Sequence, residues 1–272
     1  MLDLVLAVAA GALIGLSLGA LGGGGSILAV PVLVYALGQS PAQATTGSLV
    51  VVGVTALTGA VAAHRAGNIM LGRGVVFGVV AVGGAAAGAL GAAYVSEPVL
   101  LAAFAVLMLL VGALMAVRQL RPGTVQPHSR AALDDPIITF SPTFACACPR
   151  ALKVLITAST VGLLTGFLGV GGGFLVVPAL VLALALPMEY AVGTSLVVIV
   201  LTSAAALVVR AGSVVQPDWR LVLALTVASA AGGYVGARVA NRVDTRKLSG
   251  AFTVLVLTVA VYTAVRALPA LI

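Results

Sequence analysis

The chain is a succession of apolar runs, and most of them have the length that carries a helix across a lipid bilayer. An apolar helix needs about 20 residues to cross the hydrocarbon core. Polar or glycine- and proline-containing breaks separate the runs, which cover residues 4–20, 26–37, 47–63, 74–95 and 99–117, and then 152–168, 174–186, 194–209, 221–240 and 248–265. The pattern predicts an all-α polytopic membrane protein. Its parts would be a transmembrane repeat at 1–117, a polar cytoplasmic linker at 118–150 and a second transmembrane repeat at 151–272.

The scarcity of charge supports this class and excludes others. Only 8% of the 272 residues are Asp, Glu, Lys or Arg, against about 25% in a soluble domain. A chain with so little charge cannot cover a water-facing surface, which excludes a soluble enzyme, a disordered protein and a nucleic-acid binder. The net charge of +7 comes from basic residues at the ends of apolar runs. Lys and Arg at such places determine the orientation of the spans in the membrane.

The second half of the chain repeats the first. Gly22 matches Gly169, Pro31 matches Pro178, and Ser48 matches Ser195, each pair 147 positions apart. The segments 65–67 and 210–212 both read Arg-Ala-Gly after a slip of two residues. We therefore expect two homologous repeats, each with a short-helix hairpin broken by glycines and then three spanning helices.

The hairpin prediction comes from length. Residues 4–37 would make about 51 Å of helix at 1.5 Å per residue, too long for one span and too short for two spans with a turn. Two short helices whose tips meet inside the membrane fit this length. Irregular backbone at that depth is tolerated where protein buries it or where it lines a cavity. A hairpin that returns to its starting side makes the repeats inverted. The alternative, a single kinked crossing, gives eight spans in parallel repeats.

Basic residues set the orientation. In the inverted topology 11 of the 14 Lys and Arg residues share one side, and Arg210, Arg220 and Arg266 lie on the other. The richer side is then cytoplasmic and both termini are outside. The parallel alternative divides the same residues 10 to 4 with both termini inside, so the charge rule does not separate the two topologies.

Glycine clusters and nearby hydroxyls are the candidate substrate site. Short segments interrupted by glycine or proline, at matching places of two repeats, mark the binding sites of transporters. The helix that follows such a cluster offers free N–H groups and the positive end of its dipole to an anion. Helix capping is the structural alternative for the hydroxyls, and close helix packing is the alternative for glycine. Packing is our interpretation of the ridges Gly11-x3-Gly15-x3-Gly19 and Gly84-x3-Gly88. The candidate residues are Gly22, Gly24, Gly25, Ser26, Thr46 and Ser48 in the first repeat, and Gly169, Gly171, Gly172, Gly173, Thr194 and Ser195 in the second.

Other chemistry has little support in the sequence. No Asp, Glu, Lys or Arg falls at the centre of a predicted span, whereas proton relays in membranes use such groups. Cys146 and Cys148 do not complete a zinc site, and we interpret them as free thiols. The run Gly22–Gly25 lacks the Lys-Ser/Thr of a phosphate-binding loop. We expect no enzyme activity, cofactor or metal.

The repeated unit Gly-x3-Gly-x-Leu-Gly-x-Gly-Gly-x5-Pro-x-Leu, with the downstream Ser-Leu run and Arg-Ala-Gly turn, resembles the TauE/SafE sulfite exporter family. The resemblance covers both repeats and departs at Val170, where a strict run has glycine. It implies a multi-pass protein of the bacterial inner membrane that moves sulfite, thiosulfate or an organosulfonate. The partners would be that anion and membrane lipid, without nucleic acid; a homo-oligomer is left open. A transporter of another small solute and a non-transporting scaffold are the alternatives.

Overall fold

The structure is a computed structural model that describes residues 2–92, 97–120, 148–168, 173–210, 217–240 and 242–267. All regular structure in these ranges is helical. Within them, five helical segments are long and apolar enough to cross a membrane: Leu4–Val34, Gln43–Arg65, Leu71–Gly91, Met188–Val209 and Trp219–Ala240. These five segments make the chain a multi-pass membrane protein. Most of the predicted linker and Cys146 lie outside the described residues.

The first of these segments is folded back on itself. Helix α1 (Leu2–Leu21) runs into a 3₁₀ turn, η1 (Gly22–Gly25), and α2 (Ser26–Pro31) follows, continued by the π-helical η2 (Val32–Ala36). A methyl group added at Gly25 would lie 2.6 Å from the carbonyl oxygen of Ile14 and 2.5 Å from the backbone nitrogen of Leu18. A continuous helix would separate residues 18 and 25 by about 10 Å, so α2 lies against α1. The two form the hairpin that the length of the run predicts.

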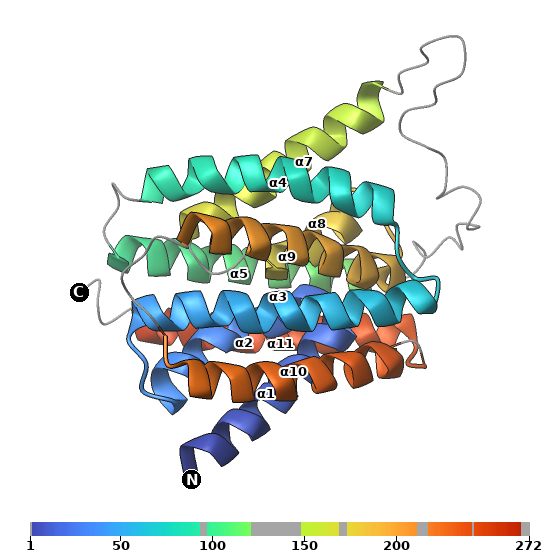
Figure 1. Cartoon of the computed structure of the whole chain (residues 1–272). Coiled ribbons are helices and arrows are strands. Elements are labelled where there is room, and N and C mark those ends of the chain that lie inside the picture. Colours follow the sequence, from blue (N-terminus) through green and yellow to red (C-terminus); the bar gives the residue numbers. More distant parts are fainter. Residues whose placement is uncertain are drawn as a thin grey trace.

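Each of the remaining helices contains one of the predicted apolar runs or most of it. In the first part they are α3 (Pro41–Arg65), α4 (Leu71–Ala92) and α5 (Glu97–Leu120). The second part has α7 (Cys148–Leu168), the short helix α8 (Gly173–Leu182), and then α9 (Met188–Arg210), α10 (Trp219–Ala240) and α11 (Thr245–Ala267). Figure 1 shows α3, α4, α9 and α10 side by side, with α1 and α7 entering obliquely from opposite ends of the bundle.

Two helices start about two turns earlier than the apolar pattern indicates. Helix α3 begins at Pro41 because Ser40 caps it: the Gln43 backbone N–H donates to Ser40 Oγ at 3.4 Å, and the Ser40 N–H donates to Gln43 Oε1 at 3.1 Å. This is a capping box with proline in the first turn. The hydroxyls near the predicted helix starts, at positions 46 and 194, therefore lie inside α3 and α9. The idea that they cap their own helices is wrong.

Close glycine contacts join α1 to α10 and α4 to α7. On α1, a methyl added at Gly11 would lie 2.7 Å from the Leu225 carbonyl oxygen, and Gly15 and Gly19 face the backbone of Ser229 and Gly233. The residue numbers of these pairs increase in the same direction along both helices, so α1 and α10 are parallel. On α4, Gly84 and Gly88 face the α7 backbone in the same manner. The glycine ridges are packing surfaces, as their spacing predicts.

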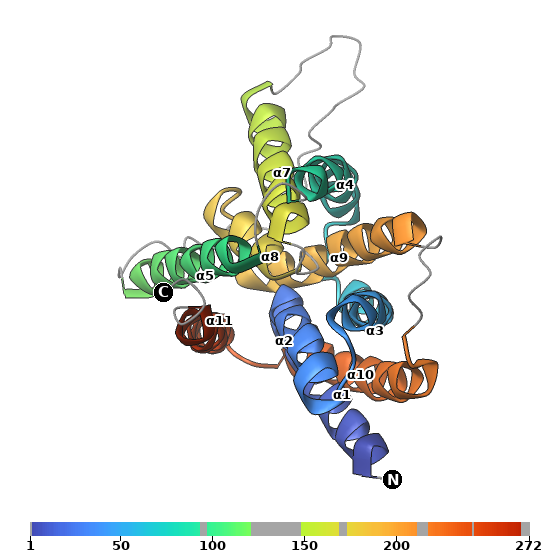
Figure 2. The same cartoon turned by 90° about the vertical axis from the view of Figure 1, so that its left-hand side faces the viewer.

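The two central helices run in opposite directions. Gly53 of α3 faces Ser203 of α9, whereas Gly59, further along α3, faces the earlier residue Leu196. Helix α3 runs parallel to α10, where the Thr55 hydroxyl donates to Ser229 Oγ at 2.7 Å. Helix α9 runs parallel to α4, because Gly74 faces Val197 and Gly78 faces Leu201. Two groups of parallel helices (α1, α3, α10 and α4, α7, α9) thus meet along α3 and α9 (Figures 1 and 2).

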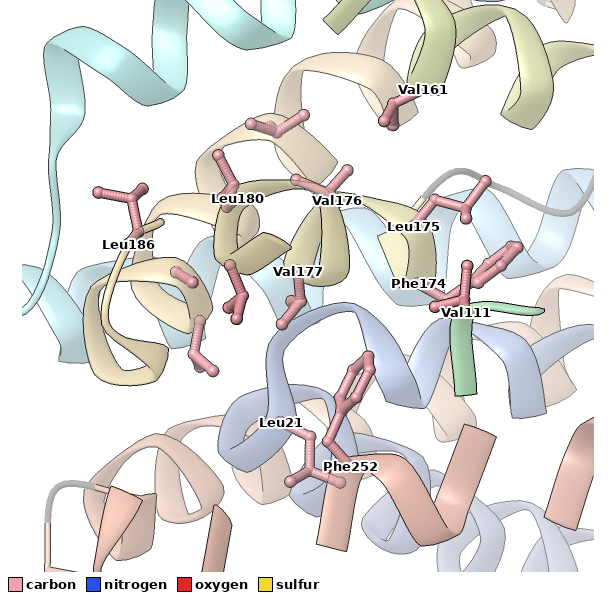
Figure 3. Packing of buried hydrophobic residues seen from close by; sticks show 14 of the residues in the cluster. Leu21, Val111, Val161, Phe174, Leu175, Val176, Val177, Leu180, Leu186 and Phe252 are labelled. Carbon is pink, nitrogen blue, oxygen red and sulfur yellow. The ribbon is translucent and has the colours of Figure 1, made fainter. Parts of the chain in front are cut away.

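The largest apolar cluster surrounds α8. Phe174, Val176, Val177 and Leu180 of that helix are at most 2% exposed. Figure 3 shows Phe252 of α11 and Leu21 of α1 near this cluster. The short helix α8 is thus enclosed by protein, which is where a short helix can be tolerated inside a membrane.

Candidate functional site

The glycine turn after α1 touches the start of α8. A methyl group added at Gly23 would overlap the carbonyl oxygen of Gly173, the first residue of α8. The Gly22 backbone has a φ of +70°, which side-chain-bearing residues rarely adopt, and Ser195 Oγ lies 2.6 Å from its ideal Cβ position. The Ser26 hydroxyl stands in the same relation to Gly173, at 2.8 Å. The structure thus brings together candidate residues of both repeats: Gly22, Ser26, Gly173 and Ser195.

The contact of Gly23 with Gly173 and the residues around it, which we call the tip crossing, leaves no room for a ligand. The Ser26 hydroxyl donates to the Gly23 carbonyl oxygen at 2.6 Å, and the Ser195 hydroxyl donates to the Val192 carbonyl oxygen at 2.7 Å. Both side chains are buried. Their hydrogen atoms are committed to backbone partners of their own segments. The tip crossing positions α1 against α8, and a ligand would have to bind beside it.

The other candidate residues take different places. Gly24 faces Leu255 and Phe252 of α11, and Gly25 faces α1. Thr194 is fully buried, and its Oγ1 accepts a hydrogen bond at 3.2 Å from the backbone N–H of Met70, directly before α4. Thr46 is half-buried early in α3. Gly169, Gly171 and Gly172 lie outside the described residues.

A cavity of about 500 Å³ lies between α3, α4, α7 and α9. This volume falls in the range of about 300–1,000 Å³ that small-molecule sites occupy. Its α7 wall is Thr165 and Gly166, directly before the second glycine cluster, and its α3 wall includes Ser48. Apolar side chains of α4, among them Val82 and Leu90, line much of the rest.

Hydroxyl groups supply the polar part of the cavity. They belong to Thr45, Ser48, Thr165, Thr202 and Ser203, and no residue of the described lining is charged. Three of the hydroxyls donate to carbonyl oxygens of their own helices: Ser48 to Thr45 at 2.9 Å, Thr165 to Gly162 at 2.8 Å, and Thr202 to Val198 at 3.0 Å. Ser203, the fifth hydroxyl, is buried.

Of these cavity hydroxyls, only Ser48 is a candidate from the sequence. Thr165, Thr202 and Ser203 sit inside long apolar helices and carry no motif. Their one sequence signal is that they are polar residues in a membrane span, which tend to face protein or a cavity. Their convergence depends on how α7 and α9 pack, which spacing along one chain does not give.

The arrangement can hold a small polar or anionic group without a fixed charge. A hydroxyl can rotate from its backbone carbonyl towards a ligand, because it carries one donor and two acceptor lone pairs. Uncharged donors bind an anion more weakly than charged ones do, which suits a site that must release what it binds.

A bundle of apolar membrane-crossing helices around an uncharged, hydroxyl-bearing cavity defines a multi-pass membrane protein with a place for a small solute. The chain belongs to the sulfite exporter TauE/SafE family, whose model matches residues 7–263. It is a membrane transporter of that family and not an enzyme.

Similar proteins carry consistent descriptions. A probable membrane transporter protein of Xylella fastidiosa strain 9a5c is 32% identical over 263 residues, covering 96% of this chain and 94% of the relative. Its counterpart in strain Temecula1 is 32% identical over 265 residues, with the same coverage. A probable membrane transporter protein of Bacillus subtilis is 37% identical over 93 residues, 34% of this chain and 33% of the relative. No solved structure matches the chain.

Proposed function

We propose that the chain is a secondary transporter that carries a small sulfur-containing anion across the bacterial inner membrane. The anion would bind in the cavity between α3, α4, α7 and α9. The observation that carries this proposal is the cavity itself: it is polar only through hydroxyls, and it abuts the residues that lead into the second glycine cluster. The family description names sulfite as the cargo of an exporter.

Cavity size bears on the choice among sulfite, thiosulfate and an organosulfonate. A volume of about 500 Å³ far exceeds the roughly 10–15 Å³ that a single water molecule needs, and sulfite has only four heavy atoms. The walls formed by Leu49, Val82 and Leu90 would leave a bare oxyanion largely without partners. They would pack against the apolar part of an organosulfonate while the hydroxyls bind its sulfonate group. Among the three cargoes, this lining favours the organosulfonate.

The proposed architecture is a pair of inverted repeats. Two features support it: residues match at a constant spacing of 147, and the helix pairs exchange between halves. Helix α1 packs on α10 of the second half, and α7 packs on α4 of the first. The antiparallel course of α3 and α9 gives the two halves opposite directions. Basic residues at the end where α3 finishes and α9 begins, such as Arg65, Arg73 and Arg246, assign that end to the cytoplasm.

Transport in proteoliposomes tests the proposal. We expect uptake of a labelled alkanesulfonate such as ethanesulfonate, and of thiosulfate or sulfite, with mutual competition. Thr165→Val and Ser203→Ala should each raise KM several-fold, because each removes a cavity hydroxyl without changing the backbone. Thr160→Val is the matched control: its hydroxyl donates to the Ile156 carbonyl at 2.8 Å on the exposed face of the same helix as Thr165.

The outcomes separate the alternatives. Flux that none of the sulfur anions inhibits would assign the chain to another solute. Absence of any solute flux from correctly inserted protein would favour a membrane scaffold. Normal KM values in both cavity variants would remove the cavity from the binding site while leaving the transport assignment intact.

A further inference from the structure

A second, much smaller cavity lies at the other end of the central helices. Its volume is about 20 Å³, room for about one water molecule. Ala63, near the end of α3, and Glu189, at the start of α9, contribute to its lining. The larger cavity instead uses the start of α3 at Thr45 and the end of α9 at Val209. The two cavities therefore face opposite ends of the bundle, and the small one is at the end rich in basic residues.

The residues that line the small cavity are equivalent, in the other half of the sequence, to residues that line the large one. Gly19, Val192 and Leu196 line it. The residues 147 positions away in the sequence, Gly166, Thr45 and Leu49, line the large cavity. The helices correspond as well, with α1, α9 and α10 in the places of α7, α3 and α4. The two equivalent cavities thus differ in volume by a factor of about 25.

Particular contacts close the small cavity. Gly193 has no side chain, and the backbone carbonyl of Asn68, in the connection from α3 to α4, occupies the place where a Cβ would be. Two residues further on, the Met70 N–H donates to Thr194 Oγ1. The α3–α4 connection is thereby held against α9. At the corresponding positions of α3 the sequence has Thr46 and Gly47, so the same contacts cannot form there. The sequence itself makes the two ends unequal.

The packing also shows which parts could move as units. Backbone-to-backbone contacts at glycines join α1 to α10 and α4 to α7. Between the central helices, the corresponding contacts at Gly53 and Gly59 are with side chains, those of Ser203 and Leu196, at 3.2 and 3.1 Å. Close-packed backbone resists sliding more than side-chain contacts do. Apart from the backbone contacts of Gly23 with Gly173 and of Gly193 with Asn68, the boundary between α3 and α9 is therefore the place where the two helix groups can rotate against each other.

We propose that the two cavities open alternately: the structure holds the state in which the cavity at Thr45 is open, and release of the Met70–Thr194 clamp opens the equivalent cavity at Val192 while the first one closes. This proposal rests on the large cavity being the substrate site. Its test needs no substrate, so it can fail or succeed separately from the proposed function.

The test uses thiol labelling in a variant whose two native cysteines are replaced by serine. Thr45→Cys and Val192→Cys are a matched pair, since the positions are equivalent in the two repeats. A membrane-impermeant maleimide should label Thr45→Cys from one face of oriented vesicles and Val192→Cys, more slowly, from the opposite face. Adding Thr194→Val should speed labelling at Val192→Cys about fivefold, the population change that loss of one ordinary hydrogen bond gives. Thr194→Ser keeps the hydroxyl and should not.

Reciprocity is decided in the double variant. A bulky maleimide attached first at Thr45→Cys would hold the large cavity open, so it should suppress later labelling of Val192→Cys at least fivefold. Equal labelling of Val192→Cys before and after that treatment would overturn the proposal, because the cavities would then open independently. Failure of Val192→Cys to react in every background would overturn it too, since the small cavity would then be permanent packing.

Discussion

Gly23→Ala is expected to disrupt the tip crossing and destabilise the protein. The added methyl group overlaps the carbonyl oxygen of Gly173 and would lie 2.7 Å from the Phe174 backbone nitrogen. Overpacking a core costs about 1–3 kcal/mol when side chains can move aside. Here the obstacle is backbone, so we expect about 3 kcal/mol. At about 2–4 °C of Tm per kcal/mol, the value for the larger single domains, the expected fall is roughly 6–12 °C.

Gly24→Ala is the neighbouring control. Its methyl group would meet the end of the Leu255 side chain at 3.0 Å and the Phe252 ring at 3.5 Å. These groups can give way by a few tenths of an ångström. We expect Gly24→Ala to lower Tm by less than half as much. Thermal unfolding of the purified protein in detergent, followed by loss of the monodisperse peak in size-exclusion chromatography, measures both variants. Equal Tm values for Gly23→Ala and the unmodified chain would refute the tip contact and the hairpin arrangement built on it.

Two further predictions concern stability and use internal comparisons. At adjacent positions of α4, Gly83 has open space where a Cβ would be, whereas a methyl at Gly84 would lie 2.5 Å from the Ser159 carbonyl oxygen; Gly83→Ala should stabilise the chain by up to about 1 kcal/mol, and Gly84→Ala should destabilise it by about 1–3 kcal/mol. Opposite signs in thermal unfolding confirm the α4–α7 contact, and equal signs contradict it. Gln39 is 6% exposed with neither amide atom hydrogen-bonded, and its counterpart Leu186 makes the same backbone bond, each N–H donating to the carbonyl six residues earlier at 3.0 Å. Gln39→Leu should therefore raise stability by about 1–3 kcal/mol, the desolvation penalty of an unsatisfied group, and a lower Tm would show that the amide has a stabilising partner.

The apolar pattern was sufficient for the helices and for the hairpin at Gly22–Gly25, because each depends on length and local composition. The starts of the helices were harder to predict. The Ser40–Gln43 capping box extends α3 by six residues into a polar segment that hydropathy alone excludes from the helix. Spacing identified the glycine ridges as packing surfaces but did not say which helix each ridge meets. That choice depends on how the chain closes in three dimensions.

The candidate substrate site stays a prediction, and the structure shows only where its described residues lie. Of the candidate residues, Gly22, Ser26, Gly173 and Ser195 lie close together. The cavity hydroxyls Thr165, Thr202 and Ser203 were missed because a single hydroxyl in an apolar helix has no pattern. Thr194 shows the converse: its match to a candidate site position drew attention, whereas in the structure its hydroxyl binds the backbone before α4.

An uncharged site makes a prediction about the driving force. The described cavity lining has no charged residue to offset the cargo, so a monoanion that crosses unaccompanied carries one full negative charge across the membrane. Moving one charge through 100 mV is worth about 2.3 kcal/mol. With the interior negative, this favours export and would sustain an outside-to-inside concentration ratio of about 50 at equilibrium, since each 1.36 kcal/mol is about tenfold.

Proteoliposomes loaded with labelled sulfonate and potassium, then given valinomycin in low-potassium buffer, develop an interior-negative potential. Efflux should accelerate under that condition and slow when the gradient is reversed, with Thr160→Val behaving like the unmodified chain. An efflux rate that does not change with the membrane potential would mean that a compensating ion moves with the anion. The uncharged cavity would then be an incomplete description of the site, because some group outside it must bind that ion.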